Sequence, residues 1–334
     1  MKKVAIVRRN GLGDLLCAFP LVLYFKRYHP HTHITLFVDH KNYPLIRYLP
    51  PVDEVVVLPA TGNKYFNLLR VALKYRSADF DLVISAKTSP MKLMNFFLFF
   101  LGGRKRVAYV DKSWHSRMIN QPIAYDETKA KKIHQALKGL HTVAPHLQVI
   151  PHELYPRIRI SEEIKQRYQK LISVPHPSLL ISASTTRESS RFDAERIATI
   201  VNRLYDDYSF SVVIIGEKKD RQRAEAIGAK LKTPYRLCFP RNFEEFMVLL
   251  DLCDLYFIGD GGIAHIGAAL GKRGVALFGQ TSPMEWHPLS ARLSALYHPV
   301  HVNHLSDEMI ITHLQTKIEE DGLWKRQFAK SIGS

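Results

Sequence analysis

Cysteine is scarce in this chain of 334 residues, which contains three: Cys17, Cys238 and Cys253. They lie far apart in the sequence, so they do not have the spacing of a metal site. Two of them lie in apolar segments. We therefore expect reduced cysteines in the protein core, as is typical of a cytoplasmic protein.

Long apolar runs are also missing. The most apolar segment, residues 90–101, is shorter than the ~20 residues that a membrane-spanning helix needs. Asp14 interrupts the basic N-terminus and no small-residue cleavage site follows, which argues against a signal peptide. We expect residues 90–101 to form a buried helix. An interfacial anchor is the alternative, because Arg104, Lys105 and Arg106 follow at the distance of lipid headgroups.

Negative charge is in deficit. The chain has 47 Lys and Arg against 31 Asp and Glu, a formal net charge of +16. A protein this basic is expected to meet an anionic partner, either a nucleic acid or a membrane face. No RNA-binding motif and no cluster of surface aromatics supports the first alternative, a basic RNA-binding protein.

Strands and helices alternate along both halves of the chain, and a proline-marked passage, residues 145–177, separates the halves. Strands are expected at residues 4–8, 34–38, 54–58, 82–85, 106–109, 179–182, 211–215, 255–258 and 275–278. Helices are expected at residues 15–28, 65–75, 91–101, 129–141, 162–172, 194–205, 220–231, 243–250, 263–270 and 306–318. This alternation predicts an α/β protein with two Rossmann-like, parallel-sheet domains facing a shared cleft. Their expected bounds are 1–160 and 161–305, with a closing helix and tail at 306–334.

Glycine-rich turns follow a strand near each end of the chain, at residues 11–14 and 259–262. Such turns let backbone N–H groups approach an anion, and the dipole of the following helix adds to the attraction. An ordinary strand-to-helix corner is the alternative reading. Asp260 and His265 beside the second turn favour a phosphate site.

The first turn contains an acid, Asp14. It either caps the following helix or serves as a general base at the mouth of a cleft. Gly11 and Gly13, together with Asp39 at the end of the next strand, also fit a nicotinamide-dependent oxidoreductase. Leu16 occupies the third glycine position of that motif, which counts against it.

Two further polar segments follow strands in the second half. Residues 184–187, Ser-Thr-Thr-Arg, suit a diphosphate, although capping of the next helix is the simpler role. Gly216 and Asp220 follow the next strand, where Asp220 either caps a helix or holds a ribose. The literal Asp79-Phe80-Asp81 motif precedes a strand instead of ending one, so we interpret it as a turn and not as a metal site.

These motifs, in this order and spacing over nearly the whole chain, resemble glycosyltransferase family 9, the bacterial lipopolysaccharide heptosyltransferases. The residues that carry the resemblance are Gly11, Gly13, Asp14, Phe19, Pro20, Thr185, Thr186, Arg187, Gly216, Asp220, Asp260, Gly262, His265, Phe278, Gly279, Thr281, Pro283, Trp286 and Pro288. The resemblance implies a GT-B fold and inversion at the anomeric carbon, with no metal and no cofactor. It also implies an ADP-heptose donor bound by the C-terminal domain and an inner-core lipopolysaccharide acceptor bound by the N-terminal domain.

The resemblance places Asp14 at the catalytic base, and we expect Arg9, Gly11 and Gly13 on the acceptor side. The expected donor-binding residues are Thr185, Thr186, Arg187, Arg191, Gly216, Asp220, Asp260, Gly261, Gly262, His265 and Thr281. Two positions depart from the family pattern. Gly261 replaces a usual Ser or Thr, and Ser190 replaces a phosphate-binding lysine, so Arg187 or Arg191 supplies the missing charge.

The expected setting follows from the resemblance and the charge. An anionic glycolipid acceptor implies a cytoplasmic protein that associates peripherally with the inner membrane, without a nucleic-acid partner. Residues 104–106, next to the most apolar helix, are expected to take part in docking on the anionic lipid surface.

Overall fold

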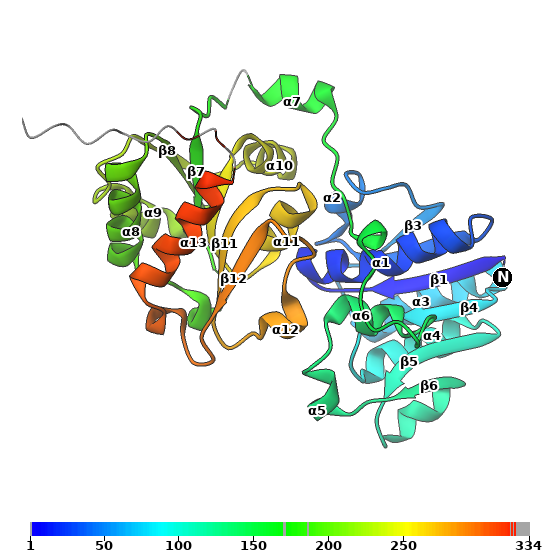
Figure 1. Ribbon diagram of the computed structural model, residues 1–334. Coiled ribbons are helices and arrows are strands. Elements are labelled where there is room, and N and C mark those ends of the chain that lie inside the picture. The colour runs from blue at the N-terminus through cyan, green and yellow to red at the C-terminus, as the bar shows by residue number, and fades with distance from the viewer. Residues whose placement is uncertain (1, 170–171, 186, 321, 323, 325–334) are drawn as a thin grey trace, which may run out of the picture. The chain divides into compact units, whose positions relative to one another are not determined.

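The computed structural model describes residues 2–169, 172–185, 187–320, 322 and 324 (Figure 1). The chain forms two compact units. The first comprises Met1–Ile158 and Met284–Trp286, and the second comprises Arg159–Pro283 and His287–Ser334. Each unit has its own parallel sheet with helices, so the predicted α/β class with two parallel-sheet domains is confirmed.

Within the described residues, the first unit has a six-stranded parallel sheet in the order β3-β2-β1-β4-β5-β6. Its strands are β1 (Lys3–Arg8), β2 (His33–Asp39), β3 (Glu54–Leu58), β4 (Leu82–Ser85), β5 (Lys105–Val110) and β6 (Gln121–Ala124). Its helices are α1 (Leu12–Tyr28), α2 (Tyr43–Ile46), α3 (Lys64–Tyr75), α4 (Lys92–Leu101), α5 (Glu127–Ala130) and α6 (Gln135–Leu140). Short 3-10 turns are η1 (Arg76–Ala78), η2 (Trp114–Met118) and η3 (His152–Leu154).

Alternating strand residues divide the helices of the first unit between the two faces of its sheet. Ala5 and Val7 of β1 share a buried cluster with side chains of α3 and α4. Helices α1 and α6 pack against each other. The central strand β1 is buried from Val4 to Val7, as expected for a parallel sheet covered on both faces.

Within the described residues, the second unit has a six-stranded parallel sheet in the order β12-β11-β10-β7-β8-β9. Its strands are β7 (Ser178–Ser182), β8 (Ser211–Ile215), β9 (Tyr235–Cys238), β10 (Leu255–Gly259), β11 (Arg273–Phe278) and β12 (Leu293–Tyr297). Its helices are α7 (Glu162–Gln169), α8 (Ala194–Asp207), α9 (Arg221–Gly228), α10 (Phe243–Leu252), α11 (Gly262–Ala269) and α13 (Asp307–Glu319), and α12 (Pro283–Trp286) adjoins them in sequence. Short turns are η4 (Glu188–Ser190), η5 (Lys218–Asp220) and η6 (Val302–His304).

The second sheet is covered by α8, α9 and α13 on one face. Their apolar side chains share a buried cluster with Leu255 and Phe257 of β10. Tyr256 lies between these two residues and points to the opposite face. There its hydroxyl donates to the carbonyl of Leu250 in α10 at 2.7 Å, and its ring lies against Gly267 of α11.

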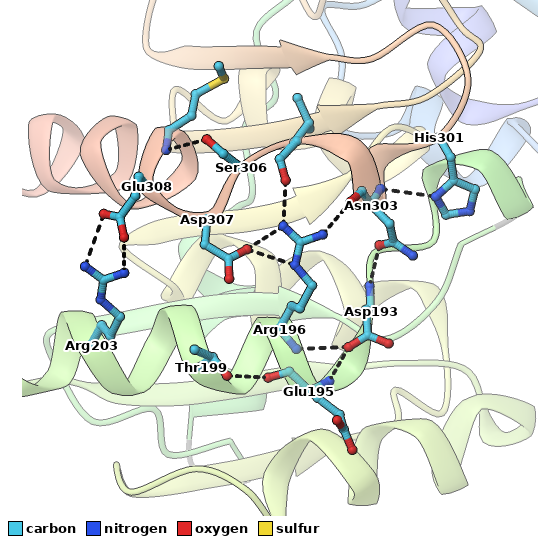
Figure 2. A network of polar contacts seen from close by, with 12 residues as sticks. Asp193, Glu195, Arg196, Thr199, Arg203, His301, Asn303, Ser306, Asp307 and Glu308 are labelled. Atoms are coloured by element: carbon cyan, nitrogen blue, oxygen red, sulfur yellow. Dashed lines mark hydrogen bonds and ion pairs between the residues drawn. The ribbon is translucent and has the colours of Figure 1, made fainter.

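A polar network ties α13 to α8 in the second unit (Figure 2). The guanidinium group of Arg196 donates to Asp307 at 2.5 and 2.9 Å, to the Asn303 carbonyl at 2.6 Å and to the Leu305 carbonyl at 2.5 Å. Farther along both helices Arg203 pairs with Glu308. One arginine thus fixes the start of the C-terminal helix through three separate groups.

Some predicted element bounds are wrong. The single helix predicted at 129–141 is two short helices, α5 and α6, because the chain leaves the helical path after Ala130 and the ring of His134 caps the next helix at Ala136 N–H, 3.2 Å away. Helix α1 begins at Leu12 instead of residue 15, so Asp14 lies in its first turn. Strands β6, β9 and β12 were not predicted.

The three cysteines form no disulfide bond, and Cys17 and Cys253 are buried whereas Cys238 is half-buried. Burial raises the pKa of the Cys238 thiol to about 11, which keeps it protonated at neutral pH. In the part of the chain that the structure describes, no helix is both long enough and apolar enough to cross a bilayer.

Candidate functional site

Asp14 sits where the first glycine turn becomes α1. Its carboxylate accepts a hydrogen bond from the N–H of Gly11 at 3.2 Å, and this bond fixes the side chain at the N-terminus of the helix. It also pairs with the guanidinium group of Arg8, the last residue of β1. The Arg8 side chain is 3% exposed and the Asp14 side chain 24% exposed. A fully buried cation therefore orients a carboxylate that keeps access to solvent.

Arg8 is anchored from a second side. Its guanidinium group also donates to the carbonyl of Ala86 at 2.7 Å, just past the end of the neighbouring strand β4. Its Nε is buried and has no hydrogen-bond partner among the described residues. Arg8 thus lies at the end of β1 and bonds to the backbone that follows β4, so its guanidinium group is fixed and holds the carboxylate of Asp14 in place.

The oxidoreductase alternative requires Asp39 to bind a ribose, but the carboxylate of Asp39 already accepts hydrogen bonds from neighbouring protein groups. Its carboxylate accepts Arg9 Nε at 2.9 Å and the N–H of Asn10 at 3.0 Å. Asn10 has a φ of 86°, in the left-handed region that asparagine tolerates better than most residues. Arg9 and Asp39 therefore shape the turn that presents Asp14.

Basic side chains gather near Asp14 in the first unit. Lys87 follows β4 and is partly buried, and its pKa is lowered by that burial and by the nearby charge of Arg8, although Asp14 opposes the shift. Lys138 adds a further positive charge. Its own ammonium is buried and bonds to Glu285 and to the carbonyl of Ala130, each at 2.9 Å. Arg8 and Lys87 are thus the cations near Asp14, whereas the charge of Lys138 is paired with Glu285.

A hollow of about 440 Å³ opens beside Lys138, under β6 and the break between α5 and α6. Its lining includes Tyr109, Tyr125 and Lys129. The Tyr109 hydroxyl donates to the Lys138 carbonyl at 2.9 Å, and burial raises the pKa of Tyr109 to about 12. This hollow was not predicted, because residues 129–141 were expected to form one continuous helix.

In the second unit, Asp260 is the buried centre of the glycine turn after β10. Its side chain is 3% exposed and forms an ion pair with Arg187. Thr281 also hydrogen-bonds its carboxylate. Burial raises the pKa of Asp260, and Arg187 and Thr281 act against that shift. Arg187, Asp260 and Thr281, three expected donor-site residues that lie far apart in the sequence, therefore meet at one carboxylate.

Gly261 forms the N-cap of α11 with a φ of 153°. An added Cβ would meet nothing within 4 Å, so the restriction comes from the backbone and not from space. Glycine adopts this conformation without strain, whereas a β-branched residue does not. The backbone of this turn therefore favours glycine at position 261. His265, one turn into α11, is buried.

Two glycines at strand ends leave room for the backbone of the 3-10 turn η4. A Cβ on Gly279, after β11, would lie 2.2 Å from the carbonyl oxygen of Ser189, and one on Gly259 would lie 3.0 Å from that of Ser190. The N–H of Gly279 donates to the Ser190 hydroxyl at 3.4 Å. The backbone of η4 is therefore seated on the ends of β10 and β11, which sets the positions of the arginines that flank it.

Those flanking arginines are held differently. Arg187 faces the buried carboxylate of Asp260, whereas Arg191 pairs at 3.0 Å with Glu188, whose side chain is 77% exposed. Thr185 accepts the N–H of Arg187 at 3.3 Å. Thr186, also expected in the donor site, lies outside the described residues.

Asp220 is engaged by its neighbours. It accepts a hydrogen bond from the Ser184 hydroxyl and one from the N–H of Glu217 at 3.3 Å. Gly216 lies beside it, since a Cβ there would stand 3.5 Å from the Asp220 Cβ. The two segments that the sequence analysis treated separately, 184–187 and 216–220, therefore form one polar corner at the ends of β7 and β8.

The Asp79-Phe80-Asp81 motif is a turn. Phe80 is buried, and Asp81 accepts the N–H groups of Lys2 and Lys3 at 2.6 and 3.1 Å. Among the described residues, no group of three or more His, Cys, Asp or Glu side chains is placed to hold a metal ion.

Comparison with known proteins decides the family. The model of glycosyltransferase family 9 (heptosyltransferase) matches residues 68–309. The chain belongs to glycosyltransferase family 9. It is 21% identical to lipopolysaccharide heptosyltransferase 1 of Campylobacter coli over 84% of each chain.

Solved structures of two similar proteins show the same fold. A family 9 glycosyltransferase from Veillonella parvula DSM 2008 has a TM-score of 0.80 at 18% identity, covering 96% of this chain and 98% of the other. The E. coli ADP-heptose lps heptosyltransferase II has a TM-score of 0.77 at 18% identity, covering 96% and 100%. The resemblance predicted from the sequence is confirmed, and the protein is a glycosyltransferase.

Family 9 membership removes the oxidoreductase and RNA-binding alternatives. The family match begins after Asp14, however, so the role of that residue depends on the geometry of the first unit. Sequence reasoning missed Arg8 and Lys87 beside it. The sequence does show a basic residue near the end of each of two apolar strands. Arg8 is the last residue of β1, and Lys87 lies two residues after β4.

Proposed function

We propose that this family 9 enzyme transfers heptose from ADP-heptose to a sugar hydroxyl of a lipopolysaccharide core acceptor, with inversion at the anomeric carbon. The donor and the acceptor are supported by similar proteins, which include lipopolysaccharide heptosyltransferases and an ADP-heptose enzyme. The observation that carries the mechanism is Asp14, a solvent-accessible carboxylate oriented by the buried Arg8.

In the proposed reaction, Asp14 accepts the proton of the acceptor hydroxyl as its oxygen attacks the anomeric carbon. The bond from that carbon to the diphosphate oxygen breaks, and ADP leaves on the opposite face, which inverts the configuration. A positioned general base contributes typically about 10²–10⁴-fold to such a step. Gly11, Gly13 and Arg9 shape the turn that presents the base.

The second unit supplies the donor site in this proposal. The N–H groups at the start of α11, at Gly261 and Gly262, face the leaving diphosphate, where a helix N-terminus favours negative charge. Asp260, with Arg187 and Thr281, orders this turn, and His265 braces the helix from within. The corner formed by Thr185, Gly216 and Asp220 receives the nucleoside in this proposal.

Arg191 is the residue that we assign to the missing lysine. Arg187 already compensates the buried charge of Asp260, so turning it toward a ligand would leave that carboxylate unpaired. To contact a phosphate, Arg191 has to leave only Glu188, whose side chain is exposed, and exposed ion pairs contribute little to stability. Ser190 cannot take the role, because its hydroxyl is buried against Gly279.

The first unit is proposed to bind the acceptor. Lys87 near Asp14 favours an anionic sugar, such as a phosphorylated or carboxylated core residue. Because this acceptor is a glycolipid, we place the enzyme at the cytoplasmic face of the inner membrane, peripherally associated.

The proposal assigns the developing charge of the diphosphate to arginine and backbone N–H groups, without a metal ion. Turnover is therefore expected to persist after the protein is treated with EDTA and desalted. Activity that is lost on chelation and returns with magnesium or manganese would contradict this assignment.

The activity test uses purified protein, ADP-heptose and a heptose-deficient core acceptor. We expect ADP release, an acceptor heavier by one heptose, and an inverted anomeric configuration by NMR. Thermal-shift measurements should show stabilisation by ADP above that by UDP, GDP or NAD. At a ligand concentration of about 100 times Kd this stabilisation is about 2.7 kcal/mol. Stabilisation by another nucleotide, or absence of product, would refute the proposed donor or reaction.

A further inference from the structure

A cluster of aromatic rings lies on the surface of the first unit, where α4 meets η2. The ring centroids of Phe96 and Trp114 are 5.7 Å apart, those of Phe96 and Phe100 are 6.3 Å apart, and those of Phe99 and Phe100 are 5.4 Å apart. Trp114 is 59% exposed and Phe99 is 42% exposed. Isolated exposed rings are ordinary, but a contiguous exposed apolar patch marks an interaction site.

The exposed rings extend beyond the face by which α4 packs into its own unit, and Phe100 is partly buried against the core at the border between the two faces. The core-facing side chains of α4 are Leu93, Met94, Phe97, Leu98 and Leu101. Phe96, Phe99 and Phe100 are spaced at i, i+3 and i+4, so they form a second apolar side of the same helix. The helix thus carries more apolar surface than its fold buries.

Two basic side chains border the rings, and one carboxylate, that of Asp111, accepts hydrogen bonds from Ser113 and Ser116 at η2. The ammonium of Lys92 lies 6.0 Å from the ring centroid of Phe96 and 5.3 Å from that of Trp114, and the guanidinium of Arg106 lies 5.7 Å from that of Phe99. Helix α4 and turn η2 contain no Asp or Glu. The neighbouring helix α3 also has no acidic residue and has Lys64, Arg70 and Lys74.

We propose that the aromatic face, defined as Phe96, Phe99, Phe100 and Trp114 with Lys92 at its edge, docks the enzyme on an anionic lipid leaflet. This inference deepens the proposed function, since it rests on a glycolipid acceptor. Aromatic rings favour the boundary between headgroups and acyl chains, and the basic rim is attracted to anionic headgroups. A second copy of this chain fits less well, because two copies of so basic a surface repel each other.

Residues 104–106, which the sequence predicts to take part in docking, differ in how they are held in the structure. Arg104 forms ion pairs with Asp79 and Asp81 at 3.4 and 3.7 Å. Arg106 donates to the carbonyls of Gly103 and Met118 at 3.1 and 2.9 Å. The guanidinium group of Arg106 is held by the protein, whereas Arg104, with a side chain 70% exposed, and the exposed Lys105 stay candidates for the docking predicted from the sequence.

The test is co-sedimentation of the full-length protein with vesicles. We expect binding to vesicles containing phosphatidylglycerol, weak binding to pure phosphatidylcholine, and release as salt rises. The double variant Phe99→Gln, Trp114→Gln should lower partitioning by about tenfold or more, and Lys92→Gln by about fivefold. The matched control is Val300→Gln, Met309→Gln, which removes two exposed apolar side chains of the second unit.

Turnover on a water-soluble, lipid-free core oligosaccharide separates docking from catalysis. The aromatic variant should turn over the soluble acceptor at the normal rate. On acceptor embedded in anionic vesicles, the same variant should lose turnover. Unchanged partitioning of the aromatic variant, equal binding to neutral vesicles, or an equal loss in the control would overturn the docking face. Conversion of a dimer into a monomer by the same variant, with vesicle binding intact, would overturn it in favour of a contact between copies. Absence of turnover on the soluble acceptor would refute the proposed function, while the partitioning measurement still decides the docking face.

Discussion

Replacement of Asp14 by Asn tests whether this acid is a base or a structural partner of Arg8. Asn keeps the size of the side chain and an oxygen that accepts the N–H of Gly11, but it cannot take the acceptor proton. We expect kcat to fall by about 10²–10⁴-fold, or about 3–5 kcal/mol in activation free energy. The Kd for ADP should stay nearly unchanged, because donor contacts are assigned to other residues.

The same substitution also lowers stability, and the structure gives its size. Removing one partner of a buried ion pair costs about 3–5 kcal/mol. Here Arg8 is buried but Asp14 is 24% exposed, so water offsets part of the loss. We expect the free energy of unfolding of the first unit to fall by about 1–3 kcal/mol. Arg8→Gln should cost a similar amount, because it leaves Asp14 without its cation.

The double variant separates the two roles. Arg8→Gln combined with Asp14→Asn removes both charges, so it should regain part of the stability that either single variant loses. Turnover should not return, because the base is still missing. Urea unfolding and an ADP-release assay on all four proteins complete the cycle. Near-normal turnover in Asp14→Asn, or in the double variant, would refute the assignment of Asp14 as the base.

Three further predictions concern the remaining charges. The pKa of Lys87 is lowered chiefly by burial, so this lysine loses its proton at a lower pH than an ordinary lysine. The KM for an anionic acceptor should therefore rise in that alkaline range, and Lys87→Arg should shift the rise to higher pH. A KM that does not change with pH would contradict a role of Lys87 in acceptor binding. Arg191→Gln should weaken ADP binding by about 10–100-fold in calorimetry, and Glu188→Gln should leave it intact; a normal Kd in Arg191→Gln would remove this arginine from the donor site. Arg196→Ala should lower the free energy of unfolding of the second unit by about 1–3 kcal/mol, since four hydrogen bonds to α13 and its approach are lost. Unchanged urea unfolding would show that the network in Figure 2 is not stabilising.

The interior strands were predictable because they are continuous apolar runs between turn residues. Leu179–Ile181 and Val212–Ile214 are of this kind, and both are buried in the sheet. The strands that were missed, β6, β9 and β12, lie at the ends of their sheet orders. Edge strands are covered on fewer sides, so they tolerate the polar residues and proline seen in QPIA and YRLC, and their apolar pattern is weak.

The candidate site was partly predictable. Asp14 and Asp260 stand in glycine turns, which a sequence shows directly. The cation that pairs with each acid does not follow from any spacing, because Arg187 and Asp260 are joined by strand order across the sheet and not by position in the chain. The burial of Arg8 was likewise hidden, since a basic residue at the end of a strand is usually exposed to solvent.

The seating of η4 on Gly259 and Gly279 limits how this enzyme can diverge. Side chains between Arg187 and Arg191 can change while their backbone still meets the strand ends, as Ser190 in place of lysine illustrates. The number of residues cannot change, because one inserted residue would displace an arginine by about 3.3 Å along the chain. Variation in donor preference within this lineage should therefore occur by substitution in the segment, and insertions and deletions should be found on either side of it.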